Sequence, residues 1–134
     1  MNAKEYLSQA FIIDQRIDSK LEQVSSLRAL AEKVTVSYGQ ERVMSTRQPS
    51  PIENAIVKLI ELENEINDDI DKLVDLKKTI MDRIASVKSD ENRLILELRY
   101  LSFKTWEDIA EIMNYSYRQV HRIHSEALKD FKVY

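Results

Sequence analysis

Two arginines near the C-terminal end have a spacing that suits the recognition of DNA bases. Arg118 and Arg122 are four positions apart, so on a helix both side chains lie on one face, while Val120 and Ile123 face the core. The guanidinium group is the side chain best suited to bidentate hydrogen bonding with guanine, and each good pair contributes about 1 to 3 kcal/mol of discrimination. We therefore hypothesise that Arg118 and Arg122 contact bases.

Other chemistry has little support in the sequence. His121 and His124 are three positions apart and could share a metal ion, but Ser125 and Glu126 are the only further ligands nearby, so we expect no metal. The chain has no Cys, no Gly-rich phosphate loop, and no His placed near a Ser and a carboxylate at a known motif spacing. We expect no catalytic residues, no cofactor and no enzyme activity.

The elements around the two arginines predict a helix-turn-helix. Thr105 can cap a short helix, Asn114 can take the left-handed conformation of a tight turn, and Ser116 with Gln119 forms a capping box that opens the next helix. An earlier helix is expected to carry an apolar stripe. The predicted inward-facing residues are Leu94, Leu98 and Leu101 on the first helix, Trp106, Ile109, Ala110 and Met113 on the second, and Val120, Ile123, Ala127, Leu128 and Phe131 on the third.

This segment resembles the promoter-recognising helix-turn-helix of sigma-70 region 4. The matching stretches are Arg93–Tyr100, Thr105–Met113 and Ser116–Ile123, followed by Glu126–Leu128. The resemblance implies a DNA-binding transcriptional regulator. By position it assigns groove contacts to Tyr117, Arg118, His121 and Arg122, and contacts nearer the DNA backbone to Ser125 and Lys129. Gln119 either caps its own helix, which the geometry favours, or contacts DNA.

The region before this segment predicts two long helices. Heptad spacing, in alternating steps of 4 and 3, runs from Asn2 to about Val34 and again from Ile52 to Val87. Ser50 and Pro51 mark the start of the second helix, and a loop over residues 35–50 joins the two. The predicted apolar positions of the second series are Ile52, Ile56, Leu59, Ile66, Ile70, Leu73, Ile80, Ile84 and Val87, with Glu63 and Lys77 as exceptions; Lys20 is the exception in the first series.

Composition agrees with an all-α fold. The 134 residues include one Gly and two Pro, too few for the turns of a sandwich or barrel. We predict an antiparallel coiled-coil hairpin over residues 1–89 and a three-helix DNA-binding domain over residues 90–134. The apolar runs are too short for a signal peptide or a membrane span, so we expect a cytoplasmic protein without a membrane partner.

The net charge of −3 first appears to argue against binding to nucleic acid. Residues 117–134, however, carry four basic and two acidic side chains, so the recognition helix and its tail are positive. The weak overall charge predicts few phosphate contacts and a shallow salt dependence. A second copy or RNA polymerase would then be needed to hold the protein on its site. A homodimer could form through remaining apolar positions such as Phe11, Leu21, Leu62 and Leu76.

The chain as a whole is similar to small phage-encoded regulators of the ArpU and RinA type, which activate late-gene transcription. The similarity lies in the heptad-rich front and the entry Ser50-Pro51-Ile52-Glu53-Asn54 to the second long helix. It implies promoter DNA and host RNA polymerase as partners. Two alternatives stay open: a coiled-coil module that binds RNA polymerase or a sigma factor without contacting DNA, and, ranked lower, a packaging protein like a phage terminase small subunit.

Overall fold

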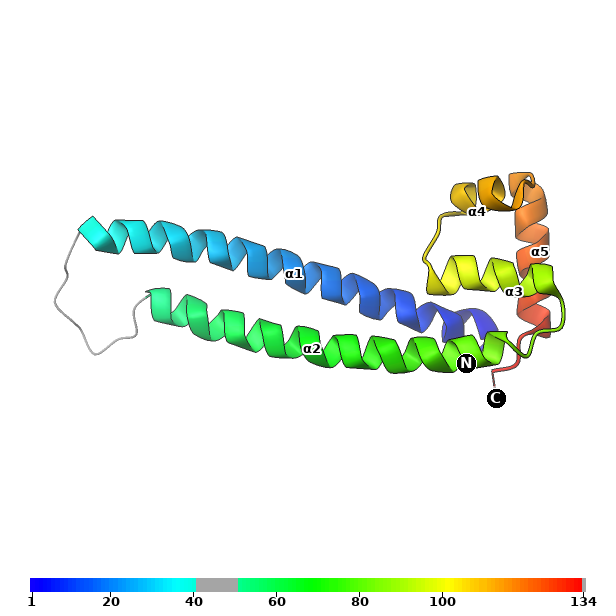
Figure 1. The fold of residues 1–134 in the computed structure, drawn as a ribbon, viewed down its shortest axis with the longest axis horizontal. Helices are drawn as coiled ribbons and strands as arrows, with labels where there is room; N and C mark the ends of the chain where they lie inside the picture. Colours follow the sequence, from blue (N-terminus) through cyan, green and yellow to red (C-terminus); the bar gives the residue numbers. More distant parts are fainter. Residues whose placement is uncertain (41–50, 134) are drawn as a thin grey trace. The chain divides into compact units, whose positions relative to one another are not determined.

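The computed structural model describes residues 1–40 and 51–133, and this part of the chain is helical without a strand, as predicted. None of the helices in these ranges is long and apolar enough to cross a membrane. The elements in chain order are α1 (Ala3–Gln40), α2 (Pro51–Ile84), α3 (Asp90–Leu96), the π-helical turn η1 (Glu97–Leu101), α4 (Trp106–Met113) and α5 (Tyr117–Asp130) (Figure 1).

The predicted start of the second long helix is confirmed, and the predicted end of the first is not. Helix α2 begins at Pro51, whose fixed φ suits the first helical position. Helix α1 continues past Val34 to Gln40, because the end of the heptad pattern does not itself terminate a helix and the stretch contains no proline. The rest of the predicted loop, residues 41–50 with the expected Ser50 cap, lies outside the described residues.

The chain divides into two compact units. Unit 1 contains residues 1–14 and 72–134, which are the first turns of α1, the last turns of α2 and all the shorter helices. Unit 2 contains residues 15–71, which are the remaining stretches of the two long helices. The predicted division into residues 1–89 and 90–134 stays a prediction.

Unit 2 is an antiparallel pair of helix segments. Lys20 of α1 lies beside Asp69 of α2, and Arg28, further along α1, lies beside the earlier residue Glu63 of α2, which fixes the opposite directions. The buried apolar side chains along the contact line are Ile17, Val24, Leu62 and Ile66. Ile17 and Val24 lie three residues before and four residues after Lys20, so they have the heptad spacing predicted for α1.

Within unit 2, the predicted contact line on α2 is wrong at Ile56, Glu63 and Ile70, whereas the later position Ile84, in unit 1, is buried as predicted. Ile56 and Ile70 are 48% and 41% exposed, and Glu63 is also exposed, whereas Leu62 and Asp69 are only 2% and 3% exposed. The true series in unit 2 keeps the half-buried Leu59 and the buried Ile66, but it takes the residue before Glu63 and the residue before Ile70, which are Leu62 and Asp69. A count of apolar residues does not separate the two series, because each contains one acidic residue in this unit, Glu63 in the predicted series and Asp69 in the true one.

Asp69 belongs to the contact line because it neutralises Lys20. The Lys20 Nζ lies 2.7 Å from Asp69 Oδ2 and 3.6 Å from Glu65 Oε2. A buried ammonium without an acceptor would be strongly destabilising. This pairing explains why the first heptad series tolerates a lysine.

Unit 1 has one hydrophobic core, to which the ends of both long helices contribute. The aromatic ring of Tyr6 lies 5.9 Å from that of Phe131, and the Nζ of Lys77 lies 4.6 Å from the ring centre of Phe103. Lys77 thus packs as a cation against an aromatic face. The buried core residues are Leu7, Ala10, Ile80, Ile84, Val87, Ile95, Leu96, Tyr100, Ile109, Val120, Ile123, Ala127 and Phe131.

Candidate nucleic-acid interface

The predicted helix-turn-helix is present, and three local hydrogen-bonding features define it. The Oγ1 of Thr105 accepts from the backbone N–H of Asp108 at 3.1 Å and caps α4. Asn114 adopts the left-handed conformation, with φ 58° and ψ 44°, and ends that helix. The Oγ of Ser116 accepts from the N–H of Gln119 at 3.1 Å and caps α5. The sequence predicted each of these because each depends on neighbouring residues alone.

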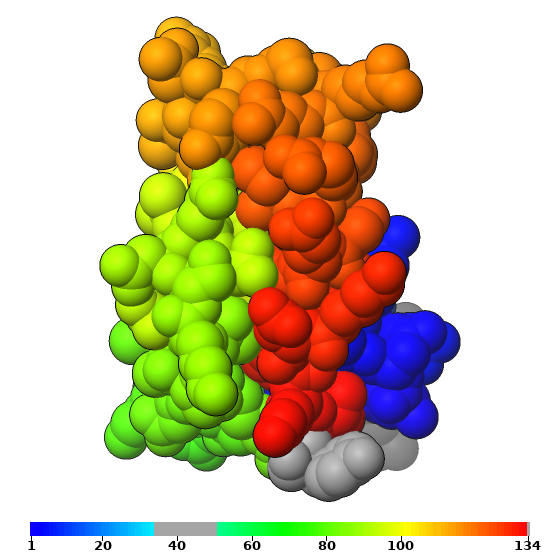
Figure 2. Space-filling model, turned by 90° about the vertical axis from the view of Figure 1, so that its right-hand side faces the viewer, coloured from blue at the N-terminus to red at the C-terminus, as the bar shows by residue number. Residues whose placement is uncertain are grey.

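Helix α3 supports α5 from the side, and Figure 2 shows the two next to each other at the surface, α3 in light green and α5 in orange to red. Asn92, which is buried, donates from Nδ2 to the carboxylate of Asp130 at 3.0 Å. Arg93 forms an ion pair with Asp90 and donates to the carbonyl of Val87 at 2.7 Å. The bond between Asn92 and Asp130 holds the C-terminal end of α5 against the start of α3, and the two Arg93 contacts fix the start of α3 itself.

The apolar stripe predicted for this first helix is partly wrong. Leu94 is exposed, Leu98 and Leu101 are half-buried, and the fully packed residues are Ile95, Leu96 and Tyr100. The π-helical turn η1 shifts the register after Leu96, so a spacing based on 3.6 residues per turn does not apply.

Helix α5 divides into a buried face and an exposed face. Val120, Ile123, Ala127 and the following Phe131 are buried as predicted, and Leu128 is half-buried. Four predicted DNA contacts, at successive spacings of 4, 3 and 4, form one exposed stripe that we call the α5 stripe. Its members are Arg118, Arg122, Ser125 and Lys129.

The two arginines of the α5 stripe border a shallow hollow at the start of α5. The hollow is lined by Ser116, Arg118, Gln119 and Arg122, and Gln119 is half-buried. The Nη1 of Arg122 lies 3.9 Å from Glu126 Oε1, one turn further along, and both side chains are more than half exposed. A surface pair at this distance is weak and can exchange for a stronger acceptor. Ser125 donates from Oγ to the carbonyl of His121 at 3.1 Å.

Tyr117 and His121 belong to an aromatic row beside the α5 stripe. The ring centre of His121 lies 4.5 Å from that of Trp106 and 4.4 Å from that of Tyr117. Its Nε2 is buried and has no hydrogen-bond partner among the residues that the structure describes, and the residue as a whole is half-buried. Tyr117, in contrast, is exposed. His121 therefore packs between two rings, and Tyr117 presents the outer surface of the row.

A buried pair of residues next to this row was not predicted from sequence. The hydroxyl of Tyr100 and the Nε2 of His124 are 2.6 Å apart, and His124 also packs edge-on against Trp106. Burial raises the pKa of Tyr100 to about 12. Burial also lowers the pKa of His124 to about 4, with smaller contributions from the positive charges of Lys4, Arg99 and His121. A neutral imidazole bonded to a protonated phenol thus joins η1 to α5.

A further contact involves the turn between α4 and α5. A hydrogen bond to Glu91, together with the negative charge of that residue, raises the pKa of Tyr115. Within residues 1–40 and 51–133, no three His, Cys, Asp or Glu side chains are grouped as a metal site would require.

A short helix, a left-handed turn and a capped helix with an exposed basic stripe define a helix-turn-helix domain. Residues 89–132 match the family Sigma-70, region 4, a DNA-binding domain typical of transcription regulators and not an enzyme family. The resemblance inferred from the sequence is confirmed over this segment. Neither a curated protein nor a solved structure matches the chain.

Proposed function

We propose that the protein is a sequence-specific DNA-binding regulator, a phage or prophage late-gene activator of the ArpU and RinA type that acts with host RNA polymerase. The observation that carries the proposal is the α5 stripe, which lies on the second helix of the region-4 match. In helix-turn-helix proteins this second helix enters the major groove. The activator role rests on the likeness to the phage regulators.

Each candidate residue has a proposed task. Arg118 and Arg122 contact base edges, since both are exposed on the first two turns of α5. Lys129, near the end of the stripe, contacts the phosphate backbone, and the Ser125 hydroxyl does so beside it. Tyr117 is exposed and can pack against sugar or phosphate, while His121 supports it from behind.

Gln119 has a smaller proposed role. The backbone N–H of Gln119 donates to the capping hydroxyl of Ser116. Its side chain lines the hollow together with those of Arg118 and Arg122. The side chain of Gln119 is half-buried where those of Arg118 and Arg122 are exposed, so it is less accessible for a hydrogen bond to a base. We therefore expect its substitution to affect specificity less than theirs.

The proposed organisation places DNA binding in residues 90–134 and a coiled-coil hairpin in residues 1–89. The exposed apolar residues Ile56, Ile60 and Ile70 lie on one face of α2 in unit 2, beside the contact line with α1. Burying this face against a second copy would give a homodimer with two recognition helices. That arrangement compensates for the few phosphate contacts of a single copy. Leu62, considered for this role from sequence, is buried within unit 2 and is unavailable.

Selection of bound sequences from a random DNA library tests the proposal. The full chain is compared with Arg118→Ala/Arg122→Ala and with Arg28→Ala, which removes an exposed arginine of a surface ion pair from unit 2. We expect one enriched motif for the wild type and for Arg28→Ala, and none for the double variant. If the wild type enriches no motif yet binds RNA polymerase, the protein is an interaction module instead.

The activator role needs its own measurement. Transcription in vitro from a promoter that carries the enriched motif should rise when the protein is added together with host RNA polymerase. The double variant should leave the transcript level at its basal value. A fall in transcript with wild-type protein would show a repressor and would contradict the proposed sign of regulation.

A further inference from the structure

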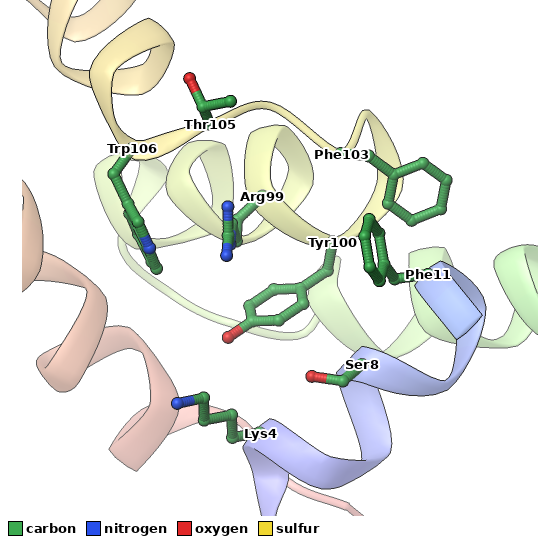
Figure 3. Close-up of a pocket in the computed structure, with 8 residues that line it drawn as sticks. All are labelled: Lys4, Ser8, Phe11, Arg99, Tyr100, Phe103, Thr105 and Trp106. Atoms are coloured by element: carbon green, nitrogen blue, oxygen red, sulfur yellow. The ribbon is translucent and has the colours of Figure 1, made fainter. Parts of the chain in front are cut away.

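Unit 1 contains a pocket of about 290 Å³ on the side formed by α1, η1 and the start of α4. This volume is near the small end of the range of ligand sites, roughly 300 to 1,000 Å³. Figure 3 shows the lining side chains around a common space, with Trp106 on one side and the rings of Phe11 and Phe103 on the other. The lining residues are Lys4, Ser8, Phe11, Arg99, Tyr100, Phe103, Thr105 and Trp106.

The charged groups of this pocket are all positive. Lys4 and Arg99 line it, and no aspartate or glutamate does. No ion pair or hydrogen bond engages the Lys4 ammonium within the described part of the chain. Both cations disfavour protonation of His124, which lies behind Tyr100, so their field extends into the pocket wall. A pocket with two cations and no carboxylate favours an anionic ligand.

Four of the eight residues that line the pocket are aromatic. The rings of Phe11 and Phe103 meet edge to face, with centres 5.7 Å apart. The Arg99 guanidinium lies 4.3 Å from the ring centre of Trp106 and donates to the carbonyl of Lys104 at 3.0 Å, which fixes its position. The Tyr100 ring is held by the bond to His124. Such flat walls suit a planar ring.

The backbone that carries these residues has two uncommon features. Arg99 and Tyr100 lie on the π-helical turn η1, and Phe103 has a positive φ of 56°. π-Helical turns occur frequently at functional sites, and a bulky residue at positive φ is strained. Both features bring side chains into the same pocket.

We propose that this pocket binds a small aromatic carboxylate. The carboxylate pairs with the cations of Lys4 and Arg99, and the ring packs against the aromatic walls. Charge-assisted hydrogen bonds from the two cations provide the recognition of the anion, and the hydroxyl of Ser8 offers a further donor on the same helix as Lys4. The site is separate from the α5 stripe, and the proposal does not depend on DNA binding.

Trp106 allows binding to be followed directly, because it is the only tryptophan in the chain and lines the pocket. The full chain is titrated, without DNA, with benzoate, with the neutral isostere benzamide and with acetate, and the single indole N–H resonance is recorded by NMR. We expect a saturable shift with benzoate and a dissociation constant at least ~10-fold lower than for the other two, about 1.4 kcal/mol in binding free energy.

Two charge-removing variants and one control locate the anion. Lys4→Gln changes an exposed side chain and should weaken benzoate binding about 5- to 10-fold without altering the melting temperature. Arg99→Gln should weaken it at least as much. Lys88→Gln removes an exposed lysine of unit 1 that does not line the pocket and should leave binding unchanged.

Four outcomes would overturn the proposal. Equal affinity for benzoate and benzamide would mean that the charge is not recognised. Equal affinity for benzoate and acetate would mean a general anion site without ring recognition. A shift that does not saturate, or that is the same in the wild type and in Lys4→Gln, would mean that no such site exists here.

Discussion

The ammonium of Lys20 and the carboxylate of Asp69 meet 2.7 Å apart in the contact line between α1 and α2, where apolar residues are the rule. The side chain of Lys20 is 15% exposed and that of Asp69 is 4% exposed, so solvent screens the pair only weakly. A polar pair in such a line selects one register of the two helices, because any slip would leave one of the charges unpaired.

Removal of one member of this pair should therefore be costly. Lys20→Met removes the ammonium that lies 2.7 Å from the buried carboxylate of Asp69 and should lower the free energy of unfolding by about 3 kcal/mol. Urea unfolding monitored by circular dichroism measures the change. As a control, Arg28→Ala breaks the exposed pair with Glu63 and should cost less than about 1 kcal/mol. Equal losses in the two variants would contradict the special role of Lys20.

The same pair can be replaced as a whole. Lys20→Leu/Asp69→Leu removes both charges and should be close to neutral or stabilising, since no buried charge is left. The expected penalty is in specificity: the second apolar series of α2, through Ile56 and Ile70, can then compete for α1. More than one set of NMR resonances for unit 2, or broadened resonances, would show that the two registers compete. A single sharp set would mean that packing alone fixes the register.

This pair also shows which features of the fold could be predicted from sequence. The caps at Thr105 and Ser116 and the left-handed Asn114 were predictable because each lies within a few residues of its partner. The register of α2 was not, because Lys20 and Asp69 are 49 positions apart. The apolar spacing of α2 is compatible with two overlapping series, of which only one was predicted, and the tertiary partner Lys20 distinguishes them.

The candidate site divides in the same way. Exposure of Arg118 and Arg122 followed from helical spacing and is confirmed. The contact of His121 with Trp106 and the bond between Tyr100 and His124 were not predicted, because they join three helices. The π-helical turn that places Tyr100 has no signature in apolar spacing.

The turn between α4 and α5 gives a prediction about stability. Asn114 has φ 58°, a conformation that glycine adopts without strain and that alanine disfavours by about 1 kcal/mol or more. Asn114→Ala should therefore lower the free energy of unfolding by that amount. Asn114→Gly should change it by no more than a few tenths of a kcal/mol. Thermal unfolding of the two variants checks the difference. If both variants melt alike, backbone conformation does not control this turn.

The buried His124 should make stability depend on pH. Its pKa is about 4 in the folded protein against 6.5 ordinarily, so the unfolded chain binds more protons between these values. The contribution of His124 is fully present above pH 6.5 and is lost as the pH falls towards 4. The groups facing it are Tyr100 and Arg99 on η1, Trp106 on α4, His121 on α5 and Lys4 on α1.

Urea unfolding at the two ends of this pH range measures the effect. His124→Gln keeps a neutral polar side chain and should flatten the dependence of the free energy of unfolding on pH. Only the contribution of the other titrating groups should remain. Tyr100→Phe should lower the free energy of unfolding by about 1 kcal/mol, the typical value of one hydrogen bond. A pH profile of His124→Gln that is as steep as that of the wild type would contradict the assignment.

Two residues of the α5 stripe should respond differently in DNA binding. Arg122→Ala should weaken binding to the selected site by about 1 to 3 kcal/mol, because a base contact is lost. It should weaken binding to scrambled DNA by less. Lys129→Ala should weaken both DNAs alike and reduce the salt slope by about 1, because a phosphate contact is lost. Binding titrations at several salt concentrations separate the two. If Arg122→Ala weakens both DNAs equally, its role in base recognition is wrong.

The exposed apolar face of α2 leads to a prediction about assembly. Ile60 is 53% exposed and lies one turn from Ile56, on a face that the α1 segment of unit 2 does not cover. If a second copy covers it, Ile60→Lys/Ile70→Lys should convert a dimer to a monomer in sedimentation experiments at several concentrations. Ile12→Lys/Leu30→Lys, at two comparably exposed residues of α1, adds the same two charges as a control and should leave the dimer intact. Because Ile60→Lys/Ile70→Lys leaves α5 unchanged, this variant should still recognise the same DNA motif. It should bind a fragment with two half-sites no more tightly than a fragment with one. A wild-type protein that sediments as a monomer at every concentration would exclude the homodimer and leave RNA polymerase as the partner that must hold the protein on DNA.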